Sequence, residues 1–159
     1  MSPIVSPSLL SADFLHLEES VKMINQSNAD WLHIDVMDGV FVPNLSFGFP
    51  ILEAISPICR KPLDVHLMIV DPLKFIEPLA KVGTHIMNIH YEVSPHLHRS
   101  LTAIRAAGMK SGVTLNPHTP VEVLEDGIVY LYHIFFIHSS TDEHLEHFHF
   151  LSQLCSNRT

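Results

Sequence analysis

The sequence has little cysteine, no long hydrophobic run and no recognisable leader. Only Cys59 and Cys155 occur among 159 residues, far apart and outside any CxxC pair, which argues against a disulfide framework and a cysteine zinc site. No apolar run approaches the roughly 20 residues of a membrane span, and the N-terminus lacks the basic and apolar regions of a signal peptide. We therefore expect a cytoplasmic protein with no membrane partner.

Basic residues are also scarce. Nine Lys plus Arg stand against seventeen Asp plus Glu, which gives a formal charge of -8, and the basic residues are scattered along the chain. A phosphate-backbone footprint needs clustered basic side chains, so we expect no nucleic acid partner. Hydrophobic residues make up 47% and charged residues 16%, a mixture typical of a globular protein with a core.

Glycine and proline are missing from the last part of the chain. All eleven prolines and all six glycines lie at or before Gly127, and Arg158 is the only basic residue after Lys110. This change divides residues 1–126 from a divergent, histidine-rich tail over 127–159. A change of reading frame or splicing near residue 126 is one hypothesis, and a natural truncation with a new ending is the other.

The tail itself gives weaker signals. Its first part, 128–137, could form a strand, and 141–154 could form a helix capped by Thr141. Nothing around Asp142 indicates a role for that carboxylate. Three tail histidines include a pair spaced i, i+3 that could bind metal adventitiously, but chance composition is the better interpretation; they are His144, His147 and His149.

Before the tail, short apolar, β-branched runs alternate with segments of helical spacing. Such runs are typical of strands buried on both faces; they are Ile4–Leu10, Trp31–Met37, Pro62–Val70, Thr84–Glu92 and Lys110–Pro117. The helical segments are 13–27, 49–59, 71–83, 96–108 and the beginning of one at 119–126. Asp71 and Thr119, each before a proline, mark helix starts, and Gly83 and Gly108 mark helix ends.

Strict alternation of strand and helix predicts an α/β fold with right-handed crossovers and a parallel sheet. Five βα units in 126 residues match the number of residues per unit in a (β/α)8 barrel, but such barrels typically have about 250 residues in total. A doubly wound sheet fits the length better. No glycine-rich phosphate loop follows the first strand, however, which counts against its dinucleotide-binding version.

Two neighbouring strands carry the residues that could do chemistry. His33 and Asp35 share one face of a strand because side chains alternate with period 2, and Asp64 and His66 repeat the pattern on the next strand. A lone strand histidine is most often a hydrogen-bonded core residue, but the repeat on two strands favours a site. Two imidazoles and a carboxylate can hold Zn²⁺, Fe²⁺ or Mn²⁺. A metal there would polarise a carbonyl, and the carboxylate could remove the adjacent proton.

A second cluster of possible ligands follows the fourth apolar run. His90, Glu92, His96 and His98 could form another metal site. His96 and His98 are expected at the exposed start of a helix, so we interpret this group as solvated surface.

Several motifs together resemble the ribulose-phosphate 3-epimerase family. They are "SPSLLSADF", "HIDVMDGVFVPNLSFG", "KPLDVHLMI", "HYE" and "GVTLNPHTPVE". The resemblance runs from about Ile4 to Asp126, and "DVMDGVFVPN" with "DVHLM" is its most specific part. The related epimerase of allulose 6-phosphate shares much of this pattern, so the family is better defined than the substrate.

The resemblance implies a TIM-type (β/α)8 barrel, truncated here after about five to six βα units, with residues 1–126 as its partial domain. It implies interconversion of D-ribulose 5-phosphate and D-xylulose 5-phosphate in the pentose phosphate pathway, by proton transfer at C3 through a metal-stabilised enediolate. His33, Asp35 and His66 would ligate the divalent metal, and Asp35 would also act as acid/base. Ser8 and His66 would contact the ketopentose phosphate. Met37 and Met68 would pack beside the enediolate, and Asp38 would be structural.

The chain departs from the family pattern after these motifs. The resemblance implies a second aspartate on strand seven and a phosphate site after strands seven and eight, and we expect both to be absent here. One hypothesis is therefore an N-terminal piece of an epimerase. The alternative is a non-catalytic product that associates with other subunits, since an open barrel fragment exposes strand edges. A homo-oligomer is possible in either case.

Overall fold

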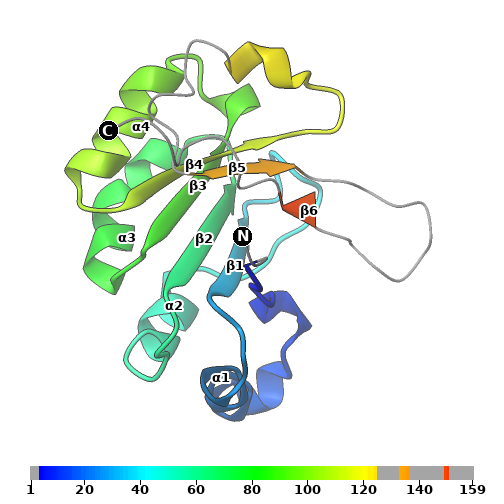
Figure 1. The fold of residues 1–159 in the computed structure, drawn as a ribbon, viewed down its shortest axis with the longest axis vertical. Helices are drawn as coiled ribbons and strands as arrows, with labels where there is room; N and C mark the ends of the chain where they lie inside the picture. Colours follow the sequence, from blue (N-terminus) through cyan, green and yellow to red (C-terminus); the bar gives the residue numbers. More distant parts are fainter. Residues whose placement is uncertain (1–3, 125–132, 137–148, 151–159) are drawn as a thin grey trace.

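A single sheet forms the centre of the computed structural model, which describes residues 4–124, 133–136 and 149–150 (Figure 1). The sheet has six strands in the order β1-β2-β3-β4-β5-β6. They are β1 (Leu32–Met37), β2 (Leu63–Met68), β3 (Ile86–His90), β4 (Lys110–Leu115), β5 (His133–Phe136) and β6 (His149–Phe150). Strands β1 to β5 pair in parallel, and β6 pairs antiparallel with β5.

Helices connect the parallel strands and succeed one another along one side of the sheet (Figure 1). The α-helices are α1 (Leu17–Gln26), α2 (Phe49–Ile55), α3 (Ile76–Val82) and α4 (Leu97–Ala106). Short 3-10 helices are η1 (Leu9–Ser11), η2 (Phe14–His16), η3 (Pro72–Phe75), η4 (Tyr91–Val93) and η5 (Val121–Leu124). The predicted α/β alternation is confirmed, and the parallel sheet is consistent with a partial barrel.

The two faces of the sheet differ in chemistry. Ile34 of β1 and Val65 of β2 belong to a core that also contains Leu52 of α2, Leu79 of α3 and Ile104 of α4. Residues of the opposite parity point to the other face, and several of them are polar yet buried; on β1 to β3 these are His33, Asp35, Asp64, His66, Asn88 and His90. Burial of polar groups requires partners, so this face must carry a hydrogen-bonded network.

The predicted first strand, Ile4–Leu10, is only partly correct. The chain does lie beside β1, where the His33 N–H donates to the Pro7 carbonyl at 2.9 Å and Ser8 bridges His33 in parallel. No full strand forms, because Pro7 has no N–H for a ladder and the backbone turns into η1 at Leu9.

The predicted helix ends are confirmed, whereas the two start signals act differently. Gly83 and Gly108 have φ of 87° and 86°, in the left-handed region that favours glycine. Asp71 makes no side-chain cap and pairs instead with Lys74 at 2.8 Å. The Thr119 hydroxyl donates to Glu92, and the segment after it forms only the 3-10 helix η5.

Parts of the tail predictions can be compared with β5 and β6. The strand predicted over 128–137 is confirmed where it is described, at His133–Phe136. The helix predicted over 141–154 is wrong at His149–Phe150, which form a strand because they pair with Phe135 and Phe136. The remaining tail positions, including Thr141, Asp142, His144 and His147, lie outside the described residues.

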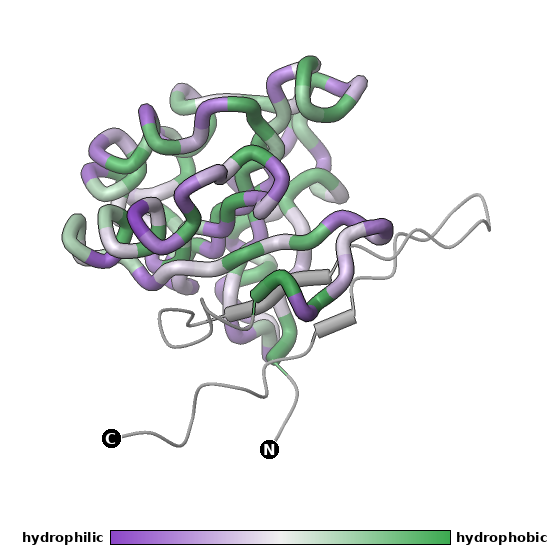
Figure 2. Tube along the Cα trace, turned by 90° about the horizontal axis from the view of Figure 1, so that it is seen from above, coloured by the Kyte–Doolittle hydropathy of each residue, from purple (hydrophilic) through white to green (hydrophobic). Residues whose placement is uncertain are grey.

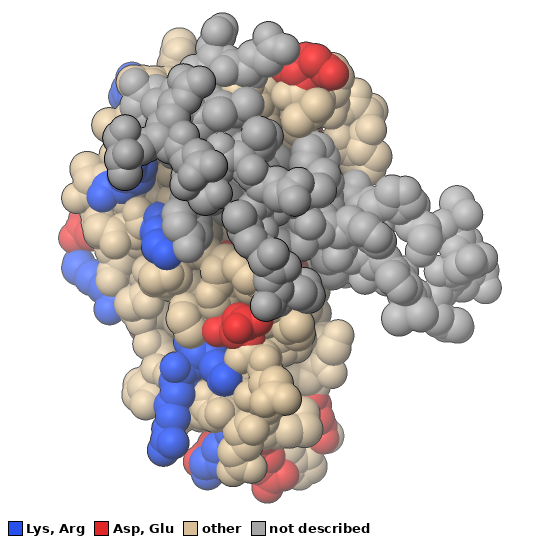
Figure 3. All heavy atoms as spheres, viewed as in Figure 1, with Lys and Arg blue, Asp and Glu red and all other residues tan. Residues whose placement is uncertain are grey.

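The distribution of hydropathy and charge follows the alternating fold. Hydrophobic and hydrophilic stretches alternate along the trace in Figure 2, and no helix of the described ranges combines the length and apolarity that crossing a bilayer requires. On the face in Figure 3, acidic and basic side chains are interspersed at several places. The expectation that the protein has no nucleic acid partner stays a prediction.

Candidate metal and catalytic site

Three buried residues on two neighbouring strands bring their ligand atoms together. Asp35 of β1 is paired in register with His66 of β2, and His33 lies two residues before Asp35 on the same face. Asp35 Oδ1 lies 3.0 Å from His33 Nε2 and 3.0 Å from His66 Nδ1. One ligand atom from each of the three residues lies within 4.8 Å of the others. The three residues that the resemblance implied as ligands therefore lie together in space.

The second nitrogen of each histidine also has a partner. His33 Nδ1 lies 2.7 Å from Asp64 Oδ2, and His66 Nε2 lies 2.9 Å from His90 Nε2. Histidines that ligate metals almost always have such a contact on the other ring nitrogen, which orients the ring. The donor types and these outer contacts fit a metal ion held by His33, Asp35 and His66.

Electrostatics at the group favour a positive charge next to the carboxylates. Burial alone would lower the pKa of His33, but hydrogen bonds and charge from Asp35 and Asp64 outweigh burial and raise that pKa to about 10. Burial would raise the pKa of Asp35, yet hydrogen bonds from His33 and His66 hold it well below its usual range. Asp35 is thus ionised.

Ser8 joins this group from the segment beside β1. Its hydroxyl donates to Asp35 Oδ2 at 2.9 Å and accepts from the Leu10 N–H at 3.2 Å, which starts η1. The predicted substrate contact of Ser8 stays a prediction. The observed contact holds the second oxygen of the Asp35 carboxylate.

His90 and Glu92 extend the network away from the metal donors. The interpretation of His90 as solvated surface is wrong, because its side chain is buried at the end of β3 and contacts His66. His90 Nδ1 lies 3.2 Å from Glu92 Oε2, while Glu92 Oε1 accepts from the Asn116 N–H at 2.9 Å. Burial and the nearby His66 lower the pKa of His90 to about 3. His96 and His98 are exposed, as predicted.

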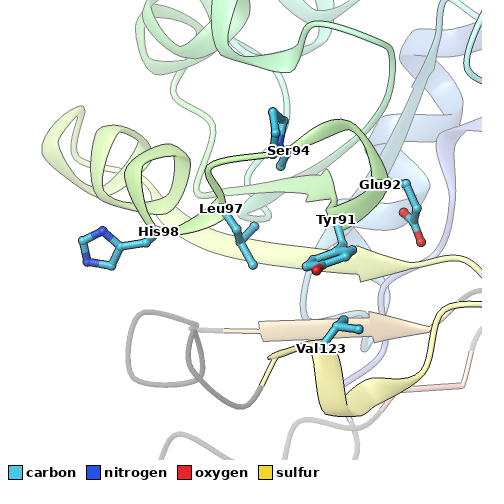
Figure 4. A pocket seen from close by; sticks show the side chains of 7 residues that line it. Tyr91, Glu92, Ser94, Leu97, His98 and Val123 are labelled. Carbon is cyan, nitrogen blue, oxygen red and sulfur yellow. The ribbon is translucent and has the colours of Figure 1, made fainter.

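Glu92 also borders an open pocket of about 380 Å³ (Figure 4). Tyr91 and Glu92 project from η4, Leu97 and His98 belong to α4, and Val123 faces them from η5. The buried network therefore ends at a partly exposed carboxylate beside this pocket.

Asp64 and Asn88 are two members of the network whose role the sequence did not indicate. Asp64 is fully buried, and its Oδ1 accepts from Asn88 Nδ2 at 2.5 Å. The alternation of Asp64 with His66 was visible in the sequence. Asn88 gave no such signal, because its contact depends on the register of β2 with β3.

The methionines and Asp38 lie at the ends of β1 and β2. Met37 and Met68 are paired in register, Met68 is buried, and Met37 borders an apolar cavity of about 300 Å³. Asp38 accepts three backbone N–H groups, from Val40, Phe41 and Val70. These bonds agree with a structural role for Asp38 in the loop after β1.

Comparison with known proteins identifies the family. A family model described as "Ribulose-phosphate 3 epimerase family" matches residues 4–155. Ribulose-phosphate 3-epimerase of Synechocystis sp. is 53% identical over 124 residues, which cover 77% of this chain and 54% of that protein. The enzyme of the same name from Bacillus subtilis is 52% identical over 121 residues, covering 76% of this chain and 56% of that protein.

A plant relative gives the same result, although the match covers a smaller share of that protein. Ribulose-5-phosphate-3-epimerase, chloroplastic, of Arabidopsis thaliana is 47% identical over 124 residues, or 77% of this chain and 44% of that protein. The chain thus spans about half the length of the curated relatives it matches. The resemblance of the motifs is confirmed, and the chain belongs to the ribulose-phosphate 3-epimerase family.

Proposed function

We propose that this chain contributes the metal-binding half of a ribulose-phosphate 3-epimerase, which interconverts D-ribulose 5-phosphate and D-xylulose 5-phosphate. The observation that carries the proposal is the buried group of His33, Asp35 and His66 in a chain of this family. In this proposal the chain acts on a phosphosugar substrate and is located in the cytoplasm.

His33, Asp35 and His66 would hold a divalent ion, with Zn²⁺, Fe²⁺ and Mn²⁺ as the candidates. Such an ion, when bound, supplies Lewis acidity that polarises a substrate carbonyl and makes the adjacent C–H more acidic. Imidazole and carboxylate ligands suit all three of these ions.

Asp35 would take the proton from C3 of the ketopentose. Its pKa is low, so it is ionised and able to accept a proton, and Ser8 holds one of its oxygens at 2.9 Å. Epimerisation also needs a proton returned to the opposite face of C3, which requires a second acid. The resemblance assigns that acid to strand seven, beyond the motifs matched in this chain, so in the chain alone the catalytic proposal requires water to return the proton.

A non-catalytic chain that associates with full-length epimerase subunits is the second candidate. The specific observation in its favour is that the matched segment makes up 54% and 56% of the two bacterial relatives. On this hypothesis the metal donors are present, but turnover needs residues from another chain.

A coupled assay for D-xylulose 5-phosphate, run with the purified chain and each of the three ions, separates the candidates. The catalytic proposal expects turnover that Asp35→Asn abolishes and that Asp71→Asn, which changes an exposed carboxylate, leaves unchanged. D-Allulose 6-phosphate in the same assay tests the substrate. Absence of turnover with every ion would contradict the catalytic proposal for this chain. Size-exclusion chromatography with a full-length epimerase then tests association.

A further inference from the structure

Four residues on four neighbouring strands contact one another in a row behind the metal donors. His33 of β1 contacts Asp64 of β2, Asp64 contacts Asn88 of β3, and Asn88 lies against Gly112 of β4. The side chains of His33, Asp64 and Asn88 are at most 3% exposed. The row therefore runs through the interior and reaches the metal donors at His33.

Asp64 is held from both sides. Its Oδ2 lies 2.7 Å from His33 Nδ1, and its Oδ1 accepts from Asn88 Nδ2 at 2.5 Å. Both oxygens thus face ring or amide nitrogens, and Asp64 is not in the group of potential metal ligands found among the described residues. A carboxylate used in this way orients the imidazole and raises its strength as a ligand.

Asn88 occupies the space that a side chain at position 112 would need. Asn88 and Gly112 are paired in register on β3 and β4. A Cβ added at Gly112 would lie 1.5 Å from Asn88 Oδ1 and 2.6 Å from Asn88 Cγ. Because these atoms belong to a side chain rather than to backbone, an alanine at 112 would displace the Asn88 amide while the strand pairing survives.

We propose that Gly112, Asn88 and Asp64 act as positioning residues that set the orientation of the His33 imidazole and, through it, the metal affinity of the site. Gly112 leaves room for the Asn88 amide, the amide fixes the Asp64 carboxylate, and the carboxylate fixes His33. The effect on metal affinity rests on the proposed metal site, whereas the orientation of His33 does not.

Gly112→Ala tests the far end of this row, with Gly48→Ala as the matched control. Gly48 has a negative φ and nothing within 4 Å of an added Cβ. Zn²⁺ affinity is measured by equilibrium dialysis, and circular dichroism follows folding. Gly112→Ala is expected to weaken Zn²⁺ binding roughly 10-fold or more, and Gly48→Ala by less than twofold. Unchanged affinity in Gly112→Ala would overturn the proposal.

A double-mutant cycle shows whether Gly112 acts through Asn88. Asn88→Ala removes the amide, so it should weaken Zn²⁺ binding by itself, and adding Gly112→Ala to it should have no further effect. If Gly112→Ala weakens Zn²⁺ binding by the same factor with and without Asn88→Ala, position 112 does not act through Asn88. This result would contradict the proposal. Asn88→Ala alone also provides the test if Gly112→Ala does not fold.

A readout without metal separates this inference from the proposed function. The ring N–H protons and nitrogens of His33 are observed by NMR of the ¹⁵N-labelled chain. Asp64→Asn and Gly112→Ala should both shift the Nδ1 signals, and Gly48→Ala should not. A shift in Asp64→Asn but none in Gly112→Ala would overturn the inference. If the unmodified chain binds no Zn²⁺, the metal site fails while this measurement still decides the positioning role.

Discussion

The Nε2 atoms of His66 and His90 face each other at 2.9 Å. Two N–H groups cannot meet at this distance, so one ring donates and the other accepts. His90 is neutral because its pKa is lowered to about 3, and its Nδ1 lies beside the Glu92 carboxylate, which can only accept while it is ionised. We infer that His90 carries its proton on Nδ1 and that its Nε2 accepts from His66.

Replacement of His90 should weaken the metal site without unfolding the chain. His90→Leu removes the acceptor for His66 Nε2, so we expect Zn²⁺ affinity to fall roughly 10-fold. Equilibrium dialysis measures the change. His96→Leu, at an exposed histidine, is the control and should bind like the unmodified chain. Equal affinities for the two variants would show that the contact with His90 does not support His66.

Removal of metal should lower the stability of the folded chain. Binding of one ion at 100 times its dissociation constant stabilises the native state by about 2.7 kcal/mol. Urea unfolding with Zn²⁺ and after EDTA treatment should therefore differ by about this amount. In His66→Ala the difference should disappear, and a difference that persists would indicate that zinc binds elsewhere.

The Asp38 carboxylate should stabilise the loop after β1 in a pH-dependent way. Partial burial raises its pKa, but hydrogen bonds from Val40, Val70 and Phe41 lower it more, to below the ordinary 3.8. Its contribution is therefore complete well above pH 3.8 and is lost as the pH falls through the lower folded value. Asp38→Asn removes an acceptor for Val70 N–H, and we expect a loss of about 1 kcal/mol at pH 7.

Urea unfolding of the unmodified chain and Asp38→Asn at several pH values gives the measurement. The difference between them should shrink as the pH is lowered from about 5 toward 3. Asp71→Asn, at a more exposed carboxylate paired with Lys74, should cost less at pH 7. A difference for Asp38→Asn that does not vary with pH would contradict the role of its charge.

Thr119 should keep Glu92 ionised. Burial raises the pKa of Glu92, but the Thr119 hydroxyl and the Asn116 N–H outweigh burial and lower it. Thr119→Val keeps the shape and removes the hydroxyl, so the pKa of Glu92 should rise, as followed by ¹³C NMR of its carboxyl group. Thr102→Val, where the hydroxyl donates to the His98 carbonyl, should leave that titration unchanged.

The sequence predicted the residues of β1 and β2 in the site well, because the alternation that indicates them lies within single strands. Alternation along single strands put His33 with Asp35 and Asp64 with His66, and parallel pairing brought the two strands together in register. The failure of the predicted first strand also has a local cause, because Pro7 lacks the N–H that a ladder would need.

The outer part of the site depends on pairing between strands and could not be read from one segment. His90 looked like a surface residue because exposed histidines follow it, yet the register of β3 beside β2 buries it against His66. Gly112 carried no chemical signal at all. Its importance appears only when the Asn88 side chain is seen to occupy the space next to it.

The antiparallel direction of β6 limits which strands can be added to this sheet beside β5. In a closed barrel of parallel strands the strand after β5 would pair with it in parallel, but β6 pairs there in the opposite direction through Phe135 and Phe136. A further parallel strand could pair at this edge of β5 only after displacing β6. The pairing of β6 with β5 spans two residues, and it is the contact with which such a strand would compete.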